Sequence, residues 1–216
     1  MNVTDDDTQA INVPNTLTVT EGGTNQITIS LQWDPVTSQD VTISSSNEGA
    51  ATVSQTTVTL TSANYQSGVT VNVNGIEDND VTDEAVTLTV SSAIAPNESV
   101  SVSVTDNDTQ SIQVSETSLT MTEGANDTFD VTLAFQPANT VQVSVGSSDS
   151  GAASPTPTLL TFEPENYNIA QTVTINGVTD DDVTNESGTI TVSDTGGSIP
   201  NVTLGYTVTD DDTQAL

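Results

Sequence analysis

The chain of 216 residues contains no lysine, no arginine and no histidine. Without lysine or arginine its charge is all negative and would repel nucleic-acid phosphates and anionic membrane surfaces, so we expect no nucleic acid and no membrane insertion among its interactions. The missing histidine and lysine also remove the commonest general bases, Schiff-base chemistry and imidazole metal ligands. The sequence therefore predicts that the protein is not an enzyme.

Cysteine is absent as well, and aromatic residues make up only 3% of the chain. Neither a disulfide nor a thiolate metal site can form, so a bound cation must be held by oxygen ligands. No apolar run approaches the roughly 20 residues that a membrane span needs. Met1 leads directly into Asn2 without an apolar leader, from which we expect a fragment of a longer repeat array.

Against these absences stand 30 acidic residues and a net charge of −30. Many of the acids lie in a phrase that occurs three times, as Val3-Thr-Asp-Asp-Asp-Thr-Gln9, Val104-Thr-Asp-Asn-Asp-Thr-Gln110 and Val208-Thr-Asp-Asp-Asp-Thr-Gln214. No positive side chain can neutralise these clusters. The folded chain therefore needs an external cation, or it bears strong self-repulsion.

A long internal repeat organises the rest of the sequence. Thr20-Glu-Gly22 recurs as Thr122-Glu-Gly124, and Gly75-Ile-Glu-Asp-Asn-Asp80 recurs as Gly177-Val-Thr-Asp-Asp-Asp182, in each case 102 residues later. The last exit phrase is displaced by two more residues, which places an insertion near Asp194 to Pro200. We therefore predict two domains, 10–108 and 109–216, with 1–9 as the tail of a preceding repeat and a linker.

Each repeat has the residue pattern of β-strands. In 26–33 the side chains of Ile27, Ile29, Leu31 and Trp33 alternate with polar ones, and the valine-rich runs 86–90 and 100–104 share this period of two. About seven such strands per repeat predict an all-β fold of two tandem immunoglobulin-like antiparallel β-sandwiches. Because the aromatic residues lie inside these runs, we expect them in the core rather than on a carbohydrate-stacking surface.

The acidic residues collect in loops that follow alternate strands, and in a sandwich such loops emerge at the same end. Calcium accepts six to eight oxygen ligands in flexible geometry, whereas magnesium demands a stricter octahedron and zinc prefers histidine or cysteine. A halophilic surface would scatter its acids instead of repeating clusters in register. We therefore predict several Ca²⁺ ions, about two or more per domain pole. The candidate ligands are Glu21, Asn47, Glu48, Asp78, Asp80, Asp83, Asp106, Asp108, Glu123, Asp149, Asp180, Asp181, Asp182, Glu186, Asp210, Asp211, Asp212, Asp5 and Asp7.

Four motifs of the first repeat resemble a known family when they are taken together: Thr20-Glu-Gly22, Asn64-Tyr65, Gly75-Ile-Glu-Asp-Asn-Asp80 and Val104-Thr-Asp-Asn-Asp108. They resemble the Calx-β domain, and the chain is similar to tandem Calx-β-like repeats of giant bacterial surface proteins and adhesins. The resemblance implies a Ca²⁺ cluster at the end of each sandwich that carries the exit phrase. The ligands that it implies are Glu21, Asp78, Asp80, Asp83, Asp106 and Asp108 in the first repeat, and Glu123, Asp149, Asp180, Asp181, Asp182, Glu186, Asp210 and Asp212 in the second.

The two repeats differ within these motifs. Asn79 and Asn107 replace carboxylates at central positions of the first repeat. We therefore expect the first repeat to bind fewer ions, or to bind them more weakly, with Glu48 and Glu84 as compensating charges.

These observations predict a calcium-binding extracellular spacer of a large adhesin, secreted to the bacterial cell surface. Its partners would be neighbouring repeats, and Ca²⁺ at poles and junctions would stiffen the array, since only Thr109 and Gln110 separate the exit acids from the next strand. Two alternatives remain open. One is a Ca²⁺-dependent self-assembling filament or surface-layer subunit that binds other copies through Ca²⁺. The other is an adhesive module that binds a glycan or a protein.

Overall fold

The computed structural model describes residues 7–213. Internal contacts divide the chain into two compact units. Among the described residues there is no helix with the length and apolar character needed to cross a membrane.

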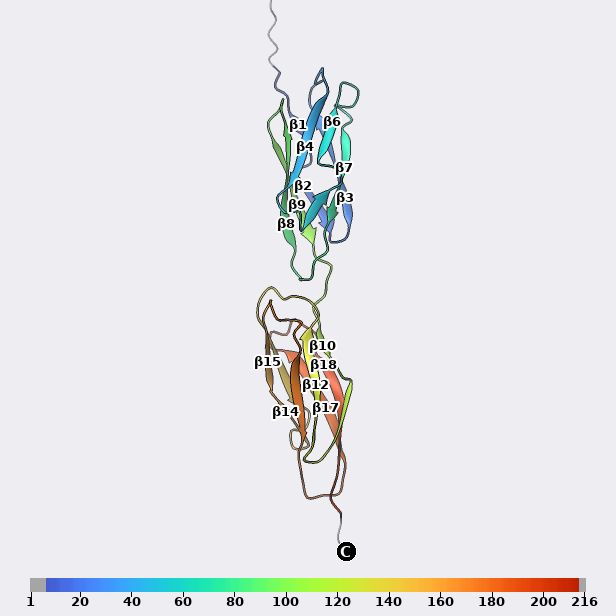
Figure 1. Cartoon of the computed structure of the whole chain (residues 1–216), viewed down its shortest axis with the longest axis vertical. Coiled ribbons are helices and arrows are strands. Elements are labelled where there is room, and N and C mark those ends of the chain that lie inside the picture. Colours follow the sequence, from blue (N-terminus) through green and yellow to red (C-terminus); the bar gives the residue numbers. More distant parts are fainter. Residues whose placement is uncertain (1–6, 214–216) are drawn as a thin grey trace, which may run out of the picture. The chain divides into compact units, whose positions relative to one another are not determined.

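The first unit contains nine strands arranged in two facing sheets (Figure 1). One sheet has the strand order β1 (Ile11–Asn12), β3 (Thr24–Leu31), β7 (Val69–Gly75) and β5 (Ala51–Val53). The other has the order β2 (Thr16–Thr20), β9 (Glu98–Thr105), β8 (Glu84–Ser92), β4 (Gln39–Ser45) and β6 (Thr57–Leu60).

The second unit repeats this arrangement strand for strand. Its smaller sheet has the order β10 (Ile112–Val114), β12 (Asn126–Leu133), β16 (Gln171–Gly177) and β14 (Ala153–Thr156). Its larger sheet has the order β11 (Ser118–Thr122), β18 (Val202–Thr209), β17 (Glu186–Asp194), β13 (Val141–Ser147) and β15 (Leu159–Phe162).

This strand order confirms the predicted all-β immunoglobulin-like sandwich. The structure has nine strands per unit instead of about seven, because the first strand is divided between the two sheets and a short strand is added beside β4. In the first unit the division falls at Pro14, whose nitrogen cannot donate to a ladder. One pair in each unit, β2 with β9 and β11 with β18, is parallel instead of antiparallel.

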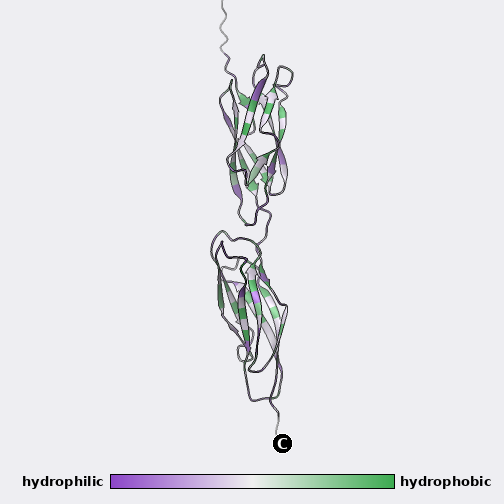
Figure 2. Cartoon of the chain, viewed as in Figure 1, coloured by the Kyte–Doolittle hydropathy of each residue, from purple (hydrophilic) through white to green (hydrophobic). Residues whose placement is uncertain are grey.

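The period-two pattern places one face of each strand in the core. Ile27, Ile29 and Leu31 are at most 1% exposed, and Phe129 and Phe162 are buried in the second core. Apolar and polar bands alternate along the strands in Figure 2. The hydrophobic effect on these valine, isoleucine and leucine side chains therefore fixes the pairing register, since a slip of one residue would expose the whole set.

The prediction that Trp33 lies in the core is wrong. Strand β3 ends at Leu31, so Trp33 stands beyond the last core position and is 43% exposed. Its counterpart Phe135 is half-buried, whereas Phe162 is fully buried. The alternation of polar and apolar residues in 26–33 thus continues to Trp33, one apolar position beyond the end of the strand.

The two units fill one core position in different ways. In the first unit Val86 and Val102 face each other on neighbouring strands and are both buried. At the equivalent positions of the second unit, Gly188 faces Tyr206, which is 3% exposed. A Cβ atom on Gly188 would lie only 2.6 Å from the Tyr206 hydroxyl oxygen. The missing side chain of Gly188 therefore makes room for the tyrosine ring.

The insertion of the second repeat forms an ordered turn between β17 and β18. The Asp194 carboxylate accepts hydrogen bonds from the backbone N–H groups of Gly196 (2.9 Å), Ser198 (2.9 Å) and Ile199 (3.2 Å). Burial alone would raise the pKa of Asp194, but these three donors hold it below its ordinary value. The predicted longer turn at 194–200 is thus organised by a single carboxylate.

Candidate metal centre

Three segments meet at one end of each sandwich because their strands end there. In the first unit these are the turn after β2, the loop after β7 and the exit from β9. The Glu21 N–H donates to the Thr105 carbonyl oxygen (3.0 Å), and the Gly75 N–H donates to the Gly23 carbonyl oxygen (3.0 Å). Gly22 adopts a φ of 62°, which a residue with a side chain rarely adopts. The Thr-Glu-Gly motif therefore makes a tight turn that directs Glu21 into the pole.

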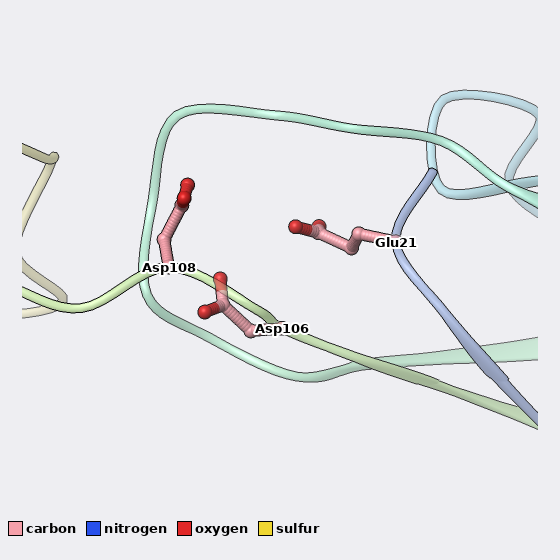
Figure 3. A group of neighbouring side chains, drawn as sticks. All are labelled: Glu21, Asp106 and Asp108. Carbon is pink, nitrogen blue, oxygen red and sulfur yellow. The ribbon is translucent and has the colours of Figure 1, made fainter. Parts of the chain in front are cut away.

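Five carboxylates at this pole form two triads that share Glu21. Glu21, Asp106 and Asp108 each offer an oxygen within 4.8 Å of the others, and so do Glu21, Asp78 and Glu84. Figure 3 shows the side chains of the first triad directed toward a common space, with the β7–β8 loop passing around them. Glu21 is only 3% exposed, and neither of its carboxylate oxygens has a hydrogen-bond partner among the described residues.

The second unit builds the same two triads from the equivalent residues. Glu123 takes the place of Glu21, and it groups with Asp180 and Glu186 and with Asp210 and Asp212. Glu123 is 5% exposed, and its Oε1 atom is buried without a partner in the described part of the chain. A third triad of Asp180, Asp182 and Asp210 forms here as well.

Burial and mutual repulsion raise the pKa values of these carboxyl groups. Burial, and then the charges of Asp78 and Asp106, raise the pKa of Glu21 from 4.5 to about 7. Burial likewise raises the pKa of Glu123, against a hydrogen bond from the Asp180 N–H (3.3 Å) that lowers it. The pKa of Glu186 is also raised, first by burial and then by Asp180 and Asp182. The positive charge of a divalent cation would offset each of these shifts, because it favours the ionised carboxylates.

Asp83 holds the exit segment in place and is not part of a triad. Its Oδ1 atom accepts from the Asp106 N–H (2.9 Å), and the equivalent Asn185 accepts from the Asp210 N–H in the same way (2.9 Å). An amide performs this task as well as a carboxylate. The position therefore needs a hydrogen-bond acceptor rather than a charge.

Several other predicted ligands lie outside the triads of the described chain. Asn47 and Asp149 each bind their own turn, by accepting from the N–H of Gly49 (3.0 Å) and of Gly151 (2.8 Å). Five more predicted ligands belong to no triad of the described chain: Glu48, Asp80, Asp181, Asp211 and the exposed Asp7. Asp5 lies outside the residues that the structure describes.

Glu84 belongs to a triad, although the sequence indicated it only as a compensating charge. The signal that could have identified it is its position 102 residues before Glu186, which was a candidate ligand. Six carboxylates occupy equivalent positions in both repeats, and all members of the triads belong to this set. They are Glu21, Asp78, Asp80, Glu84, Asp106 and Asp108, matched by Glu123, Asp180, Asp182, Glu186, Asp210 and Asp212.

Beside the triads, the two repeats carry an acidic residue at different members of one pair of positions. Glu77 and Asn107 of the first unit, joined by a hydrogen bond of 3.1 Å, correspond to Thr179 and Asp211 of the second. Each repeat thereby keeps the same negative charge at this pair. The two triads that share the buried glutamate are equivalent in both units, and their surroundings vary.

The raised pKa of Glu21 predicts how a cation and protons compete at this pole. The folded, calcium-free protein retains a proton on Glu21 between pH 4.5 and about 7, where the unfolded chain has lost it. The free energy of unfolding of the calcium-free protein should therefore fall as pH rises through this window. Calcium must displace this proton, so its affinity should weaken below about pH 7. Calorimetry in buffers of different ionisation enthalpy should show proton release at about pH 6 and little at about pH 8. Equal affinity and no proton release at both pH values would contradict the prediction.

No protein-family model matches this chain, and no curated protein matches it. Solved structures with similar architecture include the N-terminal four Ig domains of Dscam1 isoform 1.9, with 13% identity and a TM-score of 0.37 over 95% of this chain and 47% of that chain. The human desmocollin-1 ectodomain is 11% identical, with a TM-score of 0.36 over 99% of this chain and 39% of that chain. The fibronectin(III)-like modules of Clostridium thermocellum CbhA are 8% identical, with a TM-score of 0.27 over 95% and 98%.

This chain spans about half the length of the Dscam1 structure. Similarity at these TM-scores carries no argument about activity or partners. The assignment of the fold to the immunoglobulin-like sandwiches follows from the strand order of each unit.

Proposed function

We propose that this chain is a calcium-binding structural repeat of an extracellular protein, with Ca²⁺ held at the acidic pole of each sandwich. The observation that carries the proposal is the pair of triads that share a buried glutamate, built twice from equivalent residues. A carboxylate that is almost fully buried without a hydrogen-bond donor costs free energy unless a cation compensates it. Glu21 and Glu123 stand between two triads, so each would bridge two ions.

The chemistry of the donors favours calcium over other cations. All side chains of the triads offer oxygen, and they come from separate segments of the chain, which suits the variable coordination of Ca²⁺. Zinc and copper would want histidine or cysteine, and the chain has neither. With no histidine, lysine or cysteine to act as a base or nucleophile, we propose a structural role and no catalysis.

The proposed role is that of a spacer whose stiffness depends on calcium. The exit triad contains Asp106 and Asp108, which lie directly before the second repeat in the chain. A cation there would order the exit segment, whereas without it the carboxylates repel one another. Extracellular modules bind calcium with dissociation constants of about 10⁻⁴ to 10⁻³ M. A bacterial surface adhesin of the Calx-β type is the setting that we propose for such a repeat.

Calcium should raise the thermal stability of the protein well beyond the effect of ionic strength. At about 10 mM Ca²⁺ and a dissociation constant near 10⁻⁴ M, binding adds about 2.7 kcal/mol per site. The melting temperature should then rise by roughly 10 °C relative to EDTA. Differential scanning calorimetry measures this shift, and calorimetric titration gives the number of ions.

The control for this experiment is sodium chloride at the same ionic strength, because salt alone screens the repulsion among 30 acidic side chains. Magnesium at the same concentration tests selectivity. A sodium chloride sample that melts as high as the calcium sample would show that the poles bind no specific ion, and the proposal would fail.

One observation favours the alternative of an adhesive module. Trp33 is 43% exposed, and an exposed indole ring can stack on a sugar. If the first unit binds glycans, a glycan array probed in Ca²⁺ should show binding that Trp33→Ala abolishes. Glycan binding that persists in the Trp33→Ala variant would show that Trp33 does not bind the glycan.

A further inference from the structure

A glutamine follows the exit acids in each occurrence of the repeated phrase, and its side chain makes the same contacts in both units. Gln110 Nε2 donates to the Phe135 carbonyl oxygen at 2.6 Å, while its Oε1 atom accepts from the Phe135 N–H at 3.1 Å and from the Ser111 N–H at 3.0 Å. The side chain is half-buried. All three hydrogen bonds go to backbone groups.

Gln9 repeats this set of contacts at the start of the first unit. Its Nε2 atom donates to the Trp33 carbonyl oxygen at 2.8 Å, and its Oε1 atom accepts from the N–H groups of Trp33 (3.0 Å) and Ala10 (3.1 Å). Trp33 and Phe135 differ in exposure and in ring type, yet the glutamine contacts are the same. The arrangement therefore depends on the backbone and on the glutamine, not on the aromatic side chain.

The physical reason lies in the shape of the carboxamide, which carries one acceptor and two N–H donors and so imitates a peptide group. In the second unit the ladder between β10 and β12 begins with Ile112 opposite Leu133, and the Ala134 N–H donates to the Ser111 carbonyl oxygen (3.0 Å). The Gln110 side chain adds one more rung beyond this. Glutamate could not donate to the Phe135 carbonyl, and asparagine is one methylene shorter.

We propose that Gln110 is a positioning residue that fixes the linker to the second sandwich, so that Thr109 is the single residue between this clamp and the carboxylate triad that contains Asp108. This inference rests on the proposed calcium-dependent stiffening and names the element that supports it at the other end of the linker. Gln9 holds the same place before the first sandwich. Gln214 occupies the same place in the third phrase and lies outside the described residues.

The test uses the full chain with Gln110→Ala and two readouts. Amide hydrogen exchange reports the clamp directly: the N–H groups of Phe135 and Ser111 should exchange about tenfold faster or more in the variant, with or without Ca²⁺. Single-molecule energy transfer reports its consequence, with dyes on cysteines introduced at the equivalent exposed positions Thr18 and Thr120. Because the chain has no cysteine of its own, labelling is specific. In Ca²⁺ the distance distribution should be narrow in the parent protein and broad in Gln110→Ala.

Gln9→Ala is the matched control. It removes the same three hydrogen bonds from the start of the first unit, away from the linker between Thr18 and Thr120. We expect faster exchange at Trp33 and Ala10 but an unchanged distance distribution. Gln110→Glu should be intermediate, because it keeps the acceptor and loses the donor.

Two results would overturn the inference. One is unchanged exchange at Phe135 and Ser111 in Gln110→Ala, and the other is equal broadening by Gln9→Ala. If the dye-to-dye distance distribution of the parent protein does not change with Ca²⁺, that result would instead contradict the proposed stiffening function. The amide exchange rates of Phe135 and Ser111 would then still test whether Gln110 holds the linker.

Discussion

Replacing Glu21 by glutamine should abolish the calcium response of the first unit and should make the calcium-free protein more stable. Glu21 belongs to both triads of this pole, so its loss weakens two sites at once. Changes to groups that merely support a metal ligand cost about 10- to 100-fold in affinity, so loss of a shared ligand should cost more than about 100-fold. In EDTA above about pH 7, where Glu21 is ionised, the same substitution removes a buried charge that repels Asp78 and Asp106, which favours folding.

The single tryptophan of the chain makes this result specific to one unit. Trp33 lies in the first unit, so its fluorescence during thermal unfolding reports that sandwich alone. Asp83→Asn is the matched control, because it also removes one negative charge from this pole and installs the residue type that the second repeat already has. We expect that control to retain the calcium response.

Glu123→Gln should have the mirror effect, with the second unit losing its calcium response while Trp33 reports no change. If Glu21→Gln and Asp83→Asn weaken calcium binding equally, the pole acts as a diffuse negative surface and the triads have no special role. An EDTA-treated Glu21→Gln protein that is less stable than its parent would contradict the argument from buried charge.

Gly188→Val should destabilise the second unit by about 3 kcal/mol, because a side chain there collides with the buried ring of Tyr206. Tyr206→Val alone should cost a similar amount, since it leaves a cavity opposite the glycine. The double variant recreates the valine pair of the first unit, Val86 and Val102, and should recover most of the stability. The two substitutions should therefore be coupled by about 3 kcal/mol.

A Cβ atom on Gly188 would also lie 2.5 Å from Ser148 Oγ, so this serine must shift in the double variant, and the first unit shows that a valine and a serine fit side by side here. Ser148 Oγ accepts from the Thr189 N–H (2.9 Å), and Ser46 Oγ accepts from the Thr87 N–H (2.9 Å) beside Val86 in the first unit. Calorimetry of the full chain in Ca²⁺ should show the transition of the second unit moving while the fluorescence of Trp33 stays unchanged. Additive losses in the double variant would show that the two residues do not compensate each other.

The fold could be predicted because the pattern that encodes it is local and is written twice. Alternation in runs such as 27–31 identifies strands, and the offset of 102 residues identifies two domains. The sequence does not show how far a sheet extends. The apolar alternation runs on to Trp33, and only the pairing of β3, which ends at Leu31, decides that this indole is outside the core.

The location of the acidic pole could be predicted from the sequence, but the residues that form its triads could not all be identified. Loops after alternate strands do meet there, and Glu21, Asp106 and Asp108 were identified from their motifs. Asp149 was a candidate by charge, but its carboxylate caps its own turn. Asp83 and Glu84 are adjacent in the sequence, but Asp83 accepts a hydrogen bond from the Asp106 N–H, whereas Glu84 joins a triad. Comparison of the repeats would have separated them, because position 83 tolerates asparagine and position 84 keeps glutamate.

The parallel strand pair determines how a sandwich responds to being pulled. Tension on the chain enters the first unit at β1, which pairs with β3 through two residues only, and then reaches β2. Strand β2 runs parallel to the last strand, β9, over five residue pairs, from Thr16 and Ser101 to Thr20 and Thr105. The load then runs along the strands, so the hydrogen bonds between them share it and do not open one after another. Glu21 and Asp106 directly follow the two strands. An ion held by both would tie the strand ends together, so calcium would set the force at which the domain ruptures.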